Sequence, residues 1–117
     1  DVLFGQQGRD RFRFNSFFDG RDTIRDFNGN QDRIEIALTG FTSGSRPGAF
    51  TGFNSGLRLG TIAANQFTFG SATQSTHRFI FNNDTLFFDA DGSGVLPAVQ
   101  LAKVFGNVVS RTNIVVV

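Results

Sequence analysis

Apolar residues alternate with polar ones in several short segments, which is the pattern of half-buried β-strands. The clearest case is residues 33–38, where Ile34, Ile36 and Leu38 occupy every second position. The apolar content of residues 96–105 fits either a strand or a short helix that starts at Pro97, and of the two we expect the strand. By the same criteria we expect further strands at residues 11–14, 23–26, 67–69, 78–82, 85–89 and 113–117.

A short Asp-x-apolar motif recurs along the chain. Its first two copies begin at Asp1 and Asp10, nine residues apart, and the intervening segment contains two glycines. A loop followed by a short strand at this period is typical of a parallel β-roll. A longer loop at 15–21 then interrupts the period, and later copies begin at Asp22, Asp32 and Asp84.

Turn-forming residues organise the second half of the chain. Asn83-Asp84 is expected to join two strands in a tight hairpin, and Asp91-Gly92 marks the next turn. Residues 39–66 are rich in Gly, Ser and Thr and are expected to form a long loop. The recurrence of glycine every four residues from Gly40 to Gly60 leaves a cryptic repeat as the alternative.

These patterns predict one all-β domain over residues 1–117. We expect a short parallel β-roll at 1–38 and the Gly/Ser/Thr-rich loop at 39–66. An antiparallel sheet cap with the C-terminal tail, at 67–117, is expected to pack on the roll.

Composition adds two constraints. The 117 residues include 16 Phe and neither Tyr nor Trp, so phenylalanine should fill much of the core. The chain has no Cys, which excludes disulfides, Cys-ligated zinc and thiol nucleophiles. A small domain without disulfides needs another source of stability, and bound metal is one candidate.

The N-terminal segment DVLFGQQGRDRF has the residues of a calcium-binding loop. Gly5, Gly8, Asp10 and Phe12 match the nonapeptide repeat of RTX (repeats-in-toxin) proteins. Glycines permit the tight turn and expose carbonyl oxygens, aspartate adds a carboxylate, and calcium prefers such hard oxygen ligands. The candidate ligands are Asp1, Gly5, Gly8, Asp10, Asp19, Asp22, Asp26 and Asp32. Surface ion pairs with Arg25 are the alternative for Asp22 and Asp26.

Two further segments are similar to the C-terminal region of RTX proteins, including serralysin-type proteases. GRDTIRDFNGNQDRIEI resembles the segment that follows their last repeats, and RFIFNNDTLFFDADGSG resembles a later segment. The chain ends in NIVVV, which is similar to the tail that type I exporters read, with Asn113 in place of an aspartate. The match of the segment GRDTIRDFNGNQDRIEI rests on Asp22, Ile24, Asp26, Phe27, Asp32 and Ile34. The resemblance implies calcium as the ligand and a type I exporter as a partner.

Asp89 and Asp91 form a second candidate metal loop. The segment does not fit an EF-hand, because its glycine comes one place too early and no glutamate ends the loop. A hairpin turn is the alternative for this segment.

Arg9, Arg11 and Arg13 alternate with Asp10, Phe12 and Phe14, so a strand would place the three arginines on one face. This face is either solvated and paired with aspartates, or a stripe that docks an acidic polysaccharide or an acidic neighbouring subunit. Nucleic acid is not expected as a partner, because the net charge is +1 and no binding motif occurs.

Catalysis and membrane insertion are not expected. His77 is the single histidine, and neither a G-x-S-x-G nor an H-E-x-x-H motif is present. No apolar segment is long enough to span a membrane.

The sequence therefore predicts a calcium-dependent folding and type I export module of a secreted or cell-surface protein. The alternative is a structural subunit that assembles with copies of itself into an extracellular filament, sheath or surface layer.

Overall fold

The computed structural model describes residues 2–4, 8–15, 22–38, 57–89, 92–93, 98–106 and 108–117. Within these ranges most of the regular structure is β-strand, the helical segments are short 3-10 turns such as Ala64–Gln66 and Arg111–Asn113, and no α-helix is present. The expected all-β class is confirmed. None of the helical segments in the described ranges is long and apolar enough to cross a membrane.

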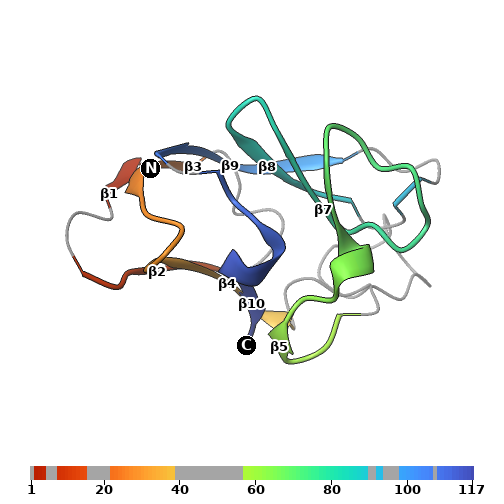
Figure 1. Ribbon diagram of the computed structural model, residues 1–117, viewed down its shortest axis with the longest axis horizontal. Coiled ribbons are helices and arrows are strands. Elements are labelled where there is room, and N and C mark those ends of the chain that lie inside the picture. The colour runs from red at the N-terminus through yellow and green to blue at the C-terminus, as the bar shows by residue number, and fades with distance from the viewer. Residues whose placement is uncertain are drawn as a thin grey trace.

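The strands form two sheets, which lie as an upper and a lower layer in Figure 1. The six-stranded sheet has the order β1 (Val2–Phe4), β3 (Asp22–Phe27), β9 (Val99–Gly106), β8 (Thr85–Phe88), β7 (Phe79–Asn82) and β6 (Phe67–Phe69). The four-stranded sheet has the order β2 (Arg11–Phe14), β4 (Arg33–Ile36), β10 (Ile114–Val116) and β5 (Gly60–Thr61).

Successive strands alternate between the two sheets at both ends of the chain. In the six-stranded sheet β3 pairs in parallel with β1 and β9, and in the four-stranded sheet β4 pairs in parallel with β2 and β10. Beyond them, β8 pairs antiparallel with both β9 and β7, and β5 pairs antiparallel with β10. At the far edge of the six-stranded sheet, β6 and β7 are again parallel. Both sheets therefore contain parallel and antiparallel pairs.

The core is built from apolar side chains that face one another along the strand register. In the four-stranded sheet Ile34 has both Phe12 and Ile114 as direct neighbours, and all three are buried. Ile36 similarly lies between Phe14 and Val116. Phenylalanine supplies much of the core, as expected: Phe12, Phe14, Phe27, Phe79, Phe81 and Phe88 are buried.

The hairpin between β7 and β8 confirms the predicted Asn83-Asp84 turn. Both residues have positive φ, 50° and 58°, as a two-residue type I′ turn requires. The backbone carbonyl of Asp84 also accepts a hydrogen bond of 2.7 Å from the N–H of Val104, which ties the turn to β9.

The pairing of β3 with β9 contains an irregularity between Ile24 and Phe27. Asp26 lies there with φ of 60°, the left-handed conformation that aspartate tolerates better than most residues. Gly106, the partner of Phe27 on β9, has φ of 123°, and a Cβ at this position would clash with the carbonyl oxygen of Phe27. The close approach of the two backbones therefore requires glycine at 106.

Two expectations, one about the C-terminal strand and one about the loop at 39–66, need correction. The C-terminal tail is expected in the antiparallel cap at 67–117, whereas β10 pairs with β4 and β5 in the sheet that does not contain β7 and β8. Part of the expected loop at 39–66 also has regular structure, because β5 at Gly60–Thr61 closes the edge beside β10 and Ile62 is buried. A two-residue strand is too short to produce a periodic signal in the sequence.

Candidate functional site

Of the candidate calcium ligands, Gly8, Asp10, Asp22, Asp26 and Asp32 lie in the described part of the chain. Asp1, Gly5 and Asp19 lie outside it, as does Asp91 of the second candidate loop. Gly8 has φ of 93°, in agreement with its predicted role at a tight turn before β2.

Asp32 joins the two loops that precede β2 and β4. Its side chain is fully buried, its Oδ1 accepts a hydrogen bond of 3.0 Å from the backbone N–H of Asp10, and its Oδ2 accepts one of 2.8 Å from the N–H of Asn28. The carbonyl oxygen of Asp10 in turn accepts a bond of 2.9 Å from the N–H of Arg33. Because each oxygen of Asp32 already accepts a backbone amide, its carboxylate holds the position of Asp10.

Among the buried side-chain oxygen and nitrogen atoms of the described residues, one atom of Asp10 stands out. Its Oδ2 is buried and has no hydrogen-bond partner among the residues that the structure describes. Buried polar atoms nearly always have a partner, and an ion is one partner that protein atoms do not supply. The carboxylate of Asp10 is therefore suited to be one of the ligands of a hard cation.

The remaining acidic candidates are not gathered around Asp10. Asp22 begins β3 and is half-buried, and Asp26 is exposed at the β3 irregularity. Within the described ranges no group of three His, Asp or Glu side chains lies close enough together to hold a metal ion. Asp10 and Asp32 are thus the two candidates that the described structure brings together.

In the second candidate loop, Asp89 follows β8 and is buried. Its backbone N–H donates to the carbonyl oxygen of Arg78 at 2.8 Å. Further on, Gly92 has φ of 65° at a turn, which agrees with the turn predicted at Asp91-Gly92, and the N–H of Ser93 donates to the carbonyl oxygen of Gln74. The described part of this loop is therefore fastened to residues 74–78.

The arginine alternation on β2 is borne out for Arg11 and Arg13, whose side chains are exposed while Phe12 and Phe14 are buried. Arg9, just before the strand, is exposed as well. Parallel pairing sets Arg33 of β4 directly beside Arg11. Glu35 on the same strand lies 3.5 Å from the guanidinium of Arg11. We call this outer surface of β2, β4 and β10 the arginine face.

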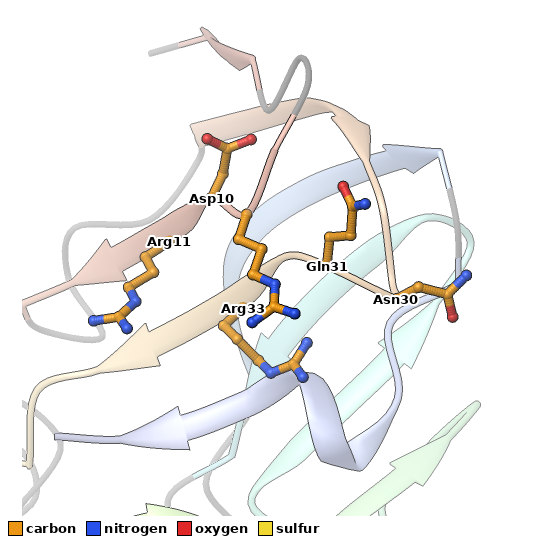
Figure 2. Close-up of a pocket in the computed structure, with 6 residues that line it drawn as sticks. Asp10, Arg11, Asn30, Gln31 and Arg33 are labelled. Atoms are coloured by element: carbon orange, nitrogen blue, oxygen red, sulfur yellow. The ribbon is translucent and has the colours of Figure 1, made fainter.

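A hollow of about 260 Å³ opens on the arginine face (Figure 2). Three of the six residues that line the hollow, Asn30, Gln31 and Arg33, were not among the candidates from the sequence, because they come from a different loop and strand than Arg9 and Arg11. The signal was present in the Phe-x-Phe and Ile-x-Ile alternations, since aligning them in parallel places Arg33 beside Arg11. The hollow is lined by Arg9, Asp10, Arg11, Asn30, Gln31 and Arg33.

The single histidine has a structural role. His77 is buried, and its Nδ1 accepts a hydrogen bond of 3.2 Å from the backbone N–H of Thr73. This bond closes the loop that precedes β7.

No protein-family model matches the chain, and neither a curated protein nor a solved structure is similar to it at a significant level.

Proposed function

We propose that this chain is a calcium-binding, non-catalytic module of a secreted or cell-surface protein, similar to the C-terminal region of RTX proteins. The observation that carries the proposal is the buried, unpartnered Oδ2 of Asp10. It belongs to the aspartate of the nonapeptide motif that is the strongest sequence match to a calcium-binding repeat. Asp10 is therefore the residue most directly open to test.

The strand order supports the proposed β-roll. The pairs β1–β2, β3–β4 and β9–β10 each contribute one strand to each sheet, and equivalent strands stack in parallel. In this arrangement the turns between the strands of successive pairs lie beside one another, as the contact between the loops at Asp10 and Asp32 illustrates. We propose that calcium is held at such turns.

The residues of the chain have distinct roles in this proposal. Asp32 holds the backbone of Asp10 in place, and Asp10 contributes a carboxylate oxygen. Calcium, when bound, supplies positive charge and accepts oxygen ligands. Where calcium is scarce the carboxylates of the first 32 residues repel one another and the chain stays loose enough for a type I exporter, whereas extracellular calcium favours the folded state.

A calcium titration of the melting temperature tests the proposal. If each site has the millimolar-range affinity of extracellular modules, a tenfold excess of calcium over Kd adds about 1.4 kcal/mol per site to the free energy of unfolding. We expect calcium to raise the melting temperature and chelation to lower it. D10N should lose most of the rise, because an amide nitrogen replaces one carboxylate oxygen.

D84N is the matched control, since Asp84 is an exposed aspartate in the hairpin turn and asparagine also tolerates its φ of 58°. It should retain the full response to calcium. A wild-type melting temperature that calcium and chelator leave unchanged would show that the module does not bind calcium. An equal loss of response in D10N and D84N would remove Asp10 from the site.

A second candidate function is self-assembly. Both β1 and β2 are edge strands of their sheets, and each pairs in parallel with its neighbour. An open edge can accept a strand from another copy. Electron microscopy of the pure protein in calcium distinguishes the two functions: filaments or sheets support assembly, and dispersed particles count against it.

A further inference from the structure

The strands of the arginine face carry Arg11, Arg13 and Arg33 but a single acidic side chain, Glu35. Arg11 and Arg33 are direct cross-strand neighbours, an arrangement that is destabilising for like charges. Within the part of the chain that the structure describes, Glu35 is the only acid pointing outward from β2, β4 and β10. Its bridge to Arg11 compensates little, because the Arg11 side chain is 76% exposed. Such a surface suits an external anion.

The hollow at Arg11 and Arg33 has donors suited to an anionic group. Guanidinium groups bind carboxylates and sulfates through paired N–H donors, and the amides of Asn30 and Gln31 add further donors. The carboxylate of Asp10 does not compete, because Figure 2 shows it turned away from Arg11 and Arg33. A volume of about 260 Å³ lies below the usual range for drug-sized ligands, so it suits a single charged sugar unit.

The surface continues beyond this hollow in one direction. A second hollow of about 210 Å³ shares Arg11 and Arg33 and extends across Glu35 to Val115 and Val117 on the β10 side. A third, of about 280 Å³, lies beside β5. Its lining includes Arg58, Thr61 and Arg111. Because the strand order is β2, β4, β10, β5, cationic residues lie on both sides of β10, which itself carries none.

We propose that the arginine face binds a linear acidic polysaccharide. One anionic sugar occupies the first hollow, and the rest of the polysaccharide runs across the strands toward β5. This role goes beyond calcium-dependent folding; Asp10 lines the first hollow too, but the proposed contacts to the anion come from the arginines and amides. Single-stranded nucleic acid fits less well, because its binding surfaces interleave aromatic side chains with basic ones, whereas Phe12 and Phe14 point into the core. An acidic protein would need a broad interface, whereas this surface is a series of small hollows.

The test is calorimetric titration of the calcium-loaded protein with two probes, a polyuronate and a sulfated polysaccharide, at low and at physiological salt. The variant R11Q/R33Q should lose about tenfold or more in affinity, because it removes two charge-assisted contacts. Its salt dependence should also be shallower, since fewer counterions are released on binding. The variant should fold, because it removes a like-charge pair.

R25Q/K103Q is the matched control, with the same change in net charge on the exposed side chains of β3 and β9 in the other sheet. It should bind both probes nearly as well as the wild type. The proposal fails if the two variants lose affinity equally, or if the wild type binds neither probe at low salt. It also fails if single-stranded DNA or polyaspartate binds more tightly than either polysaccharide. Which probe binds better tells whether carboxylates or sulfates are recognised.

Discussion

At the scale of single residues, one buried amide links the C-terminal segment to the loop before β4. Asn113 is buried, and its Nδ2 donates to the carbonyl oxygens of Gly29 at 2.8 Å and of Asp32 at 3.4 Å. Its Oδ1 accepts hydrogen bonds from the backbone N–H and the hydroxyl of Ser110. An aspartate, which the resemblance to RTX tails leads one to expect here, has no N–H to donate.

N113D should therefore lower the free energy of unfolding by about 3 kcal/mol or more, because it directs a buried carboxylate at two carbonyl oxygens. Urea denaturation at neutral pH measures the loss. N82D is the control, since Asn82 is exposed at the end of β7, and it should change stability little. Equal stability of N113D and the wild type would mean that the amide does not secure this loop.

At the scale of elements, β10 is an interior strand of the four-stranded sheet. It lies between β4 and β5, with Ile114 and Val116 buried and Val115 half-buried on the outer surface. A strand of this apolar composition would be an aggregation hazard at an edge, and pairing on both sides removes that hazard. Its burial does not conflict with the proposed export role, because in that proposal the exporter would act on the unfolded chain.

I114A should lower the free energy of unfolding by about 2–5 kcal/mol, as expected for a large-to-small change in a packed core. V115A on the same strand should lower it by less than about 1 kcal/mol, because its side chain is on the outer surface. Denaturant unfolding of both variants in saturating calcium checks the difference. Similar losses at the two positions would contradict the orientation of β10, in which Ile114 points into the core and Val115 lies on the outer surface.

At the scale of the whole molecule, the last strands complete both sheets. In the six-stranded sheet β9 separates β3 from β8, and in the four-stranded sheet β10 separates β4 from β5. Without them, the N-terminal strands retain only the pairs β1–β3 and β2–β4. Two-stranded sheets are at best marginally stable, so the two ends of the chain should fold together.

In a protein truncated after residue 98, strands β1 to β4 should therefore lack stable structure even in saturating calcium, although β6, β7 and β8 keep their mutual pairing. Far-UV circular dichroism and amide exchange measure this, and a synthetic peptide of residues 99–117 should restore part of the signal. If the truncated chain were as protected as the full chain, its N-terminal strands would form an independent unit.

The elements that depend on local chemistry could be predicted from the sequence alone. The alternation of Phe12 and Phe14 with arginines predicted β2 and its buried face, and Asn83-Asp84 predicted the hairpin, because period and turn conformation are properties of adjacent residues. For the candidate site, the nonapeptide motif singled out Asp10 and the alternation singled out Arg11 and Arg13.

Which distant segments of the chain meet depends on the tertiary structure. The chain does not encode locally that β10 joins β4 rather than the sheet of β7 and β8, because the apolar residues of 113–117 suit the interior position in either sheet. The bond between Asp10 and Asp32 spans 22 residues, and the pairing of Arg11 with Arg33 follows from the same parallel register. The physical reason is that register is selected by burying two alternating apolar faces at once, which no single segment specifies alone.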